Sequence, residues 1–313
     1  MKKIIMSLFL CLLALSCGNS NSQTANEKET KTTQKETLVT SLPPLKWLVQ
    51  QIAGDEFNVI SIVQPNMNHE LFEPKPEDLK KLEDSKLYFT YNALHFENEI
   101  TEIVQNKDKV ALVLDGVDKS LFLENHDHHE HEHADKDHDE HDKDKDEHEH
   151  HHHDEAFDPH VWFSLNMMDK VAENIKNKLV ATYPDKKETF EKNYTTFITE
   201  LNNFKKEMDD KFATKTKKYF MVYHPALNYF LAGRNVEEIA VEFEGKEPSA
   251  KQIKHIIEEA KEHNITTILV QPQFPKQSIE VISKEIPNAK IAEFNADEEN
   301  IFENLRKFVN NLE

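Results

Sequence analysis

Residues 186–212 read KKETFEKNYTTFITELNNFKKEMDDKF, a long stretch with a helical pattern. Its apolar residues recur every three or four positions, which is the period of one face of an α-helix. These residues are Phe190, Tyr194, Phe197, Leu201, Phe204 and Met208. We predict one long amphipathic helix over residues 185–213, preceded by a shorter helix near residues 165–182. We interpret the apolar stripe as core packing rather than as a cofactor site.

Short β-branched runs alternate with helical patterns on both sides of this segment. The expected strands are Thr37–Leu42, Phe57–Val63, Leu87–Tyr91, Val110–Leu114, Tyr219–Tyr223, Glu238–Phe243, Thr266–Gln271 and Lys290–Phe294. The expected helices are Leu45–Ala53, Glu77–Ser85, Glu97–Gln105, Ala250–His263, Lys276–Glu285 and Glu298–Leu312. Such alternation with short connections predicts parallel sheets flanked by helices. We therefore expect an α/β protein with two (β/α)4-type lobes, over residues 37–184 and 214–313, and a linking helix that limits lobe rotation.

The composition of the 313-residue chain excludes several classes of function. Its formal net charge of −20 argues against nucleic-acid binding, which requires a basic surface. None of the five glycines lies in a phosphate-binding pattern such as GxGxxG. Both cysteines, Cys11 and Cys17, lie near the N-terminus, so the rest of the chain has no disulfide framework and no cysteine–zinc cluster.

The N-terminus has the pattern of an export signal. Residues 1–17 contain two lysines, an apolar run too short for a permanent membrane span, and a terminal Cys17. This ending resembles a bacterial lipoprotein signal, which implies cleavage before Cys17 and lipidation of that cysteine. Residues 18–36 are then expected to form a flexible tether.

An acidic, histidine-rich segment interrupts the first lobe at residues 124–155. It contains no Leu, Ile, Val or Phe, so we expect an inserted disordered loop that is dispensable for folding. Imidazoles surrounded by carboxylates predict weak metal collection, with a solvated acidic linker as the alternative. The histidines are His126, His128, His129, His131, His133, His138, His141, His148, His150, His151, His152 and His153.

Three of the six remaining histidines lie where a ligand site is expected. His69 and His224 follow predicted strands, and ligands of α/β sheets gather at the carboxyl ends of strands. His160 lies in Asp158-Pro-His-Val-Trp162, where proline restricts the backbone and Asp158 could orient an imidazole. Three neutral imidazoles suit Zn²⁺, although other borderline metals also accept them. Of the other three, His255 is expected to be a surface residue and His263 to interact with the C-terminal end of its helix. His95 is expected at most to contact a ligand rather than the metal.

Several motifs together resemble the metal-binding lipoproteins and periplasmic proteins of zinc and manganese ABC importers, the cluster A-I solute-binding proteins. They are His69 with Phe72-Glu-Pro-Lys-Pro-Glu-Asp78, Asp158-Pro-His-Val-Trp162, His224-Pro-Ala with Tyr229-Phe230, and Glu244-Gly-Lys-Glu-Pro-Ser249. The resemblance runs from Leu38 to the C-terminus. It implies two helix-linked lobes and a metal in the interlobe cleft, held by His69 and His160 from one lobe and His224 from the other.

The chain departs from the family pattern at two positions. Many relatives have an Asp where this chain has Asn295, and an amide is a poor zinc ligand. Water, Asp297 or Glu70 could then supply the fourth ligand. Relatives also often carry Glu where this chain has Gln271. Fewer carboxylates disfavour Mn²⁺ more than Zn²⁺, so we expect zinc.

These observations lead to one expected function and two alternatives. The expected function is capture of Zn²⁺ outside the cytoplasmic membrane and delivery to a membrane ABC permease. The protein is expected to be a monomer that is lipid-anchored on the periplasmic side, with the cell surface as the other possible location. A zinc-dependent hydrolase using Glu70 as general base is the first alternative. A metal-buffering or adhesin lipoprotein is the second.

Overall fold

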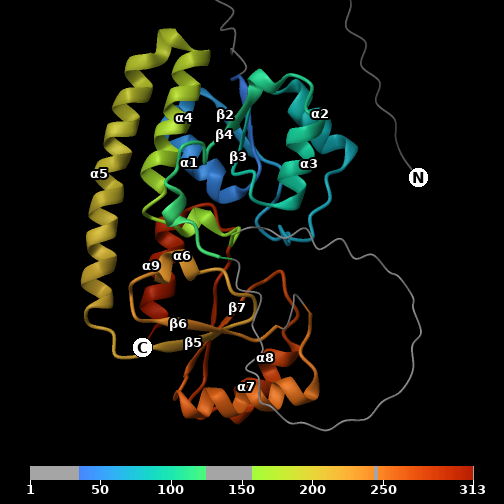
Figure 1. Cartoon of the computed structure of the whole chain (residues 1–313), viewed down its shortest axis with the longest axis vertical. Coiled ribbons are helices and arrows are strands. Elements are labelled where there is room, and N and C mark those ends of the chain that lie inside the picture. The colour runs from blue at the N-terminus through green and yellow to red at the C-terminus, as the bar shows by residue number, and fades with distance from the viewer. Residues whose placement is uncertain (1–34, 125–156, 243–245, 313) are drawn as a thin grey trace, which may run out of the picture. The chain divides into compact units, whose positions relative to one another are not determined.

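The computed structural model describes residues 35–124, 157–242 and 246–312, which contain two four-stranded parallel sheets (Figure 1). The first sheet has the order β2-β1-β3-β4 and the second the order β6-β5-β7-β8. The strands are β1 (Thr37–Thr40), β2 (Asn58–Ser61), β3 (Leu87–Thr90), β4 (Val110–Leu112), β5 (Tyr219–Val222), β6 (Glu237–Ala240), β7 (Thr267–Val270) and β8 (Lys290–Glu293). The predicted fold class is thereby confirmed. In each sheet the strand order reverses beside the first strand, which is where ligands of α/β folds bind.

Helices cover the first sheet on both faces, with α1 and α4 on one side and α2 and α3 on the other (Figure 1). Their bounds are α1 (Pro43–Ala53), α2 (Pro76–Asp84), α3 (His95–Ile103) and α4 (Met168–Thr182). Proline at the start of α1 and α2 fixes a helical φ where no N–H is needed. Buried Glu97 accepts hydrogen bonds from the backbone N–H groups of Tyr91, Ala93 and Leu94. This carboxylate fixes the turn between β3 and α3.

The second sheet contacts two different sets of apolar side chains. Met221 and Ile268 face Ile256 of α7 and Ile282 of α8. The residues that alternate with them along β5 and β7 face a larger core shared with α9 and the first lobe. The helices are α6 (Asn228–Leu231), α7 (Ala250–Glu262), α8 (Gln277–Glu285) and α9 (Ile301–Asn311). Ser249 caps α7, and its side chain accepts a hydrogen bond from the Gln252 N–H. Short 3₁₀ helices are η1 (Gly54–Glu56), η2 (Lys107–Lys109), η3 (Lys119–Leu121), η4 (Val161–Phe163) and η5 (Pro184–Lys186).

The long helix α5 (Lys187–Phe212) connects the two sheets and packs against helices of both lobes. It contacts α1 and α4 of the first lobe and α9 of the second (Figure 1). Most of the predicted stripe is buried, but Tyr194 is only partly buried and donates its hydroxyl to Asp169 across 2.8 Å. Near its C-terminal end, Glu207 forms a bidentate ion pair with Arg306 of α9 at 2.7–2.9 Å.

Phe302 of α9 sits where the two lobes meet the long helix. Its ring stacks on Phe204 at 4.2 Å between centroids and meets Trp47 of α1 edge-on at 4.9 Å. We expect Phe302→Ala to lower the free energy of unfolding by about 3 kcal/mol, because a buried ring leaves a cavity. Urea unfolding followed by circular dichroism measures this, with Phe302→Leu as the smaller change. A loss below about 1 kcal/mol would contradict a shared core at this point.

Some expectations lie outside the described residues. They are the signal segment with Cys17, nearly all of the tether, and the histidine-rich segment apart from its first residue. Among residues 35–124, 157–242 and 246–312, the helices are too short or too polar to cross a bilayer.

Candidate metal site

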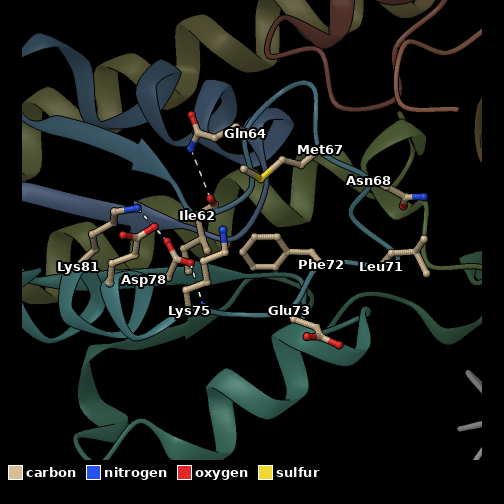
Figure 2. Close-up of a pocket in the computed structure, with 11 residues that line it drawn as sticks. Ile62, Gln64, Met67, Asn68, Leu71, Phe72, Glu73, Lys75, Asp78 and Lys81 are labelled. Atoms are coloured by element: carbon tan, nitrogen blue, oxygen red, sulfur yellow. Dashed lines mark hydrogen bonds and ion pairs between the residues drawn. The ribbon is translucent and has the colours of Figure 1, made fainter.

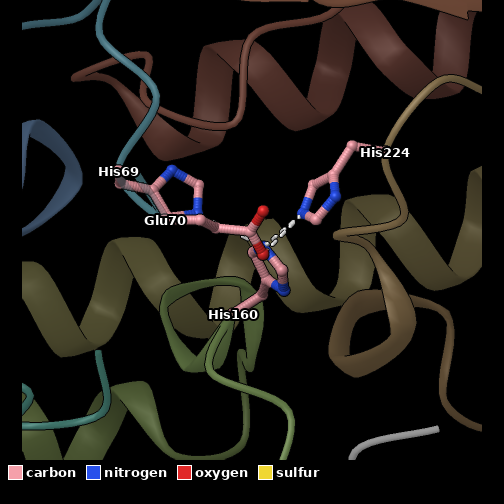
Figure 3. Close-up of side chains that lie close together, drawn as sticks. All are labelled: His69, Glu70, His160 and His224. Atoms are coloured by element: carbon pink, nitrogen blue, oxygen red, sulfur yellow. Dashed lines mark hydrogen bonds and ion pairs between the residues drawn. The ribbon is translucent and has the colours of Figure 1, made fainter. Parts of the chain in front are cut away.

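The three predicted histidines come from segments that are far apart in the sequence, and their side chains point toward one another together with Glu70 (Figure 3). His69 lies in the loop after β2, His160 directly precedes η4, and His224 follows β5. Their side chains are almost fully buried, with exposed fractions of 4–7%. Two of the imidazoles thus belong to segments that follow the carboxyl ends of β2 and β5.

The three rings direct their Nε2 atoms to one point. His160 Nε2 lies 3.4 Å from His69 Nε2 and 3.2 Å from His224 Nε2. Glu70 Oε1 lies 3.2 Å from His224 Nε2, and the four ligand atoms are all within 4.8 Å of one another. The Glu70 side chain is 31% exposed, so this side of the cluster opens toward solvent. Three nitrogens and one carboxylate oxygen at such separations can surround a single divalent cation.

A carboxylate faces the other ring nitrogen of each histidine. Asp297 lies 3.0 Å from His69 Nδ1, Asp158 lies 2.8 Å from His160 Nδ1, and Glu242 lies 2.6 Å from His224 Nδ1. When Nδ1–H donates to a carboxylate, the lone pair of Nε2 is left free for a metal. The arrangement therefore favours the same ligating tautomer in all three rings.

The second lobe holds the segment that carries His160. Asn228 of α6 donates to Asp158 Oδ2 across 3.0 Å, and the Tyr229 hydroxyl donates to the Asp158 carbonyl across 2.8 Å. Burial by itself would raise the pKa of Asp158, but the charge of His160 and hydrogen bonds from His160 and Asn228 lower it to about 2. Asp158 is thus a fixed anion at neutral pH.

The charges of the carboxylates also change the protonation of the histidines. Burial would lower the pKa of His224, but the charges of Glu70 and Glu242 outweigh it and raise the pKa to about 9. Burial likewise opposes protonation of His69, yet Asp297 and Glu70 raise its pKa above the usual value. The pKa of Glu70 is lowered, because the nearby imidazoles outweigh its desolvation. The metal-free cluster therefore attracts positive charge.

The three candidates for the fourth ligand have different positions. Glu70 belongs to the cluster, whereas Asp297 lies on the far side of the His69 ring. Asn295 donates to the Pro65 carbonyl across 2.7 Å and accepts from the Asp297 N–H. Gln271, the other departure from the family pattern, holds the backbone of His224. Its side chain accepts a hydrogen bond from the His224 N–H and donates one to the His224 carbonyl, each across 2.9 Å.

The remaining histidines of the described segments lie outside the cluster. His95 is 57% exposed near Glu99, His255 is exposed on α7, and His263 packs on the Tyr219 ring at 4.1 Å. Sequence reasoning missed Glu242, which follows β6. Because β6 pairs with β5, the carboxyl end of β6 adjoins His224. This adjacency is the signal that could have identified Glu242.

The fold and the cluster define the class of solute-binding proteins that carry a metal-ion site between two helix-linked lobes. The chain belongs to the family described as "ZnuA: Zinc-uptake complex component A periplasmic", which it matches over residues 38–313. This is a family of solute-binding proteins rather than of enzymes.

Individual relatives carry names with different metals. The chain is 29% identical over 290 residues to the zinc-binding lipoprotein AdcA of Streptococcus pneumoniae, covering 91% of this chain and 53% of AdcA. The chain thus spans about half the length of that relative. It is 27% identical to the manganese ABC transporter substrate-binding lipoprotein ScaA of Streptococcus gordonii, covering 90% of this chain and 86% of ScaA. A crystal structure of ZnuA superposes with a TM-score of 0.73 at 26% identity, covering 90% of this chain and all of that one.

Proposed function

We propose that this protein captures Zn²⁺ outside the cytoplasmic membrane and delivers it to a membrane ABC permease. One observation carries the proposal: three buried imidazoles, each oriented by its own carboxylate, direct Nε2 to one point that Glu70 also reaches. Membership of the zinc-uptake family supports the same function. Anchoring through a lipid on Cys17, on the periplasmic side, remains part of the proposal.

We assign the ligands as Nε2 of His69, His160 and His224 together with a carboxylate oxygen of Glu70. Asp297 already faces His69 Nδ1, and Asn295 donates to a backbone carbonyl, so Glu70 is the better fourth ligand. Asp158, Asp297 and Glu242 then act by orienting the three rings.

Zinc suits this ligand set better than manganese does. Zn²⁺ accepts four ligands with several nitrogens, whereas Mn²⁺ favours more oxygen ligands and a larger coordination number. The relatives bear both zinc and manganese names, so the argument for zinc rests on the ligand types. With Glu70 as a ligand, all four positions are filled by the protein, which leaves none for the water of a hydrolytic zinc centre.

Calorimetry with chelator-treated protein tests this function. We expect one tight Zn²⁺ equivalent per chain and weaker binding of Mn²⁺. Glu70→Gln should weaken Zn²⁺ binding by more than about tenfold, since even groups that only hydrogen-bond to a metal ligand contribute that much. Glu73→Gln is the matched control, because Glu73 is an exposed glutamate three residues along the same segment. The absence of a tight equivalent, or equal effects of the two variants, would contradict the assignment.

A further inference from the structure

Two side-chain amides of the second lobe donate to one carbonyl of the first lobe. The carbonyl belongs to Pro65, in the ligand loop, defined here as residues 64–70, which carries His69 and Glu70. Asn295 Nδ2 donates to it across 2.7 Å, and Gln273 Nε2 donates across 3.2 Å. These hydrogen bonds join the ligand loop to the segments that follow β7 and β8.

The surroundings fix the orientation of both amides. Gln273 Nε2 also donates to Asn295 Oδ1 and lies 3.3 Å from Asp297 Oδ2, so its neighbours are acceptors. Asn295 Oδ1 in turn accepts from the Asp297 N–H across 2.9 Å. A carboxylate at position 273 or 295 would place a negative oxygen against acceptors and would lose the donor to Pro65.

The opposite side of the ligand loop is not closely packed. A cavity of about 520 Å³ lies there, and Figure 2 shows Met67 and Phe72 directed toward Ile62 along it. Leu71, the next residue after the loop, is 78% exposed. Because few side chains support the loop from this side, its position depends on its hydrogen bonds to the second lobe.

We propose that Gln273 and Asn295 form an amide clamp on Pro65 that holds the ligand loop in its metal-binding position and slows the release of bound metal. The inference rests on the proposed function. Both residues are positioning residues, since neither belongs to the four-residue cluster. Loss of the clamp frees the loop to move toward the cavity, and His69 and Glu70 then move away from the other two ligands.

Zinc release from purified, zinc-loaded variants tests the clamp. We expect Asn295→Asp and Gln273→Glu each to release Zn²⁺ about fivefold faster when mixed with excess chelator in a stopped-flow instrument. The visible spectrum of the Co²⁺ form should match that of the unaltered protein, because the ligands are unchanged. Asn174→Asp is the matched control, since Asn174 donates to the Val113 and Asp115 carbonyls away from the cluster.

Hydrogen exchange on the metal-free protein gives a second readout. The clamp predicts faster exchange at the amides of Met67 and Glu70 in both variants, and unchanged exchange in Asn174→Asp. Release rates and exchange rates equal to those of the unaltered protein would overturn the clamp, as would a Co²⁺ spectrum showing that residue 295 had become a ligand.

If Asn295→Asp fails to fold, Gln273→Glu and Gln273→Met decide the matter. An unaltered protein without tight zinc binding would instead contradict the proposed function, and the exchange data would still test the clamp.

Discussion

His224→Ala is expected to weaken Zn²⁺ binding by about 100-fold or more. The substitution removes one of the proposed nitrogen ligands, and the carboxylates that hydrogen-bond to such ligands already contribute 10- to 100-fold to affinity. It also leaves the buried carboxylate of Glu242, which lies 2.6 Å from the imidazole, without that partner. The same reasoning applies to His69→Ala and His160→Ala, whose carboxylate partners are Asp297 and Asp158. Competition with a chelator of known affinity measures each constant.

His255→Ala provides the control for this series, because His255 is an exposed residue of α7 outside the cluster. Its zinc affinity should stay within about twofold of the unaltered protein, as surface substitutions usually have small effects. Circular dichroism of each metal-free variant shows whether the loss of an imidazole also unfolds the site; the corresponding His→Gln variants keep a polar side chain if it does. Similar losses in all four alanine variants would show that the ligands are misassigned.

The alternation of β-branched runs with helical patterns was sufficient to predict the fold class, and apolar periodicity was sufficient to predict the long helix. The stripe from Phe190 to Met208 has one period along its whole length, and burial of Phe197, Leu201 and Phe204 follows directly from it. Strand ends were less well predicted. Residues 62 and 63 belong to an expected strand, but β2 ends at Ser61 although Ile62 and Val63 remain buried. The backbone N–H groups of Ile62 and Val63 still donate to the carbonyls of Thr40 and Ser41, so burial and backbone pairing both continue beyond the assigned end of the strand. An apolar pattern reports burial, and it does not fix the residue at which a strand ends.

The positions of the histidines were predictable, whereas the directions of the carboxylates were not. His69 and His224 follow strands, so topology alone brings their backbones to the same end of the sheets. The choice among Glu70, Asp297 and Asn295 depends on which way each side chain points, and sequence spacing carries no such information. The role proposed for Gln273 depends on a tertiary contact with Pro65, which is 208 residues away along the chain.

Zinc affinity is expected to fall by at least about 100-fold between pH 8 and pH 6, with more than one proton released per Zn²⁺ bound at pH 7. A metal must displace the proton of any imidazole that is charged in the free protein, and each displaced proton lowers the apparent affinity about tenfold per pH unit below its pKa. The pKa of His224 is raised to about 9, so its proton is present throughout this range. The pKa of His69 is raised as well, which adds a second proton toward the acidic end.

Calorimetry in two buffers of different ionisation enthalpy counts the released protons at one pH. Glu242→Gln is the informative variant, because it removes one of the negative charges that raise the pKa of His224 while keeping a group of similar size. It should release fewer protons at pH 7 and flatten the dependence of affinity on pH. An affinity that is constant from pH 6 to pH 8 would mean that the imidazoles are neutral before zinc arrives. In that case the carboxylates that face the Nδ1 atoms would orient the imidazole rings without keeping them protonated.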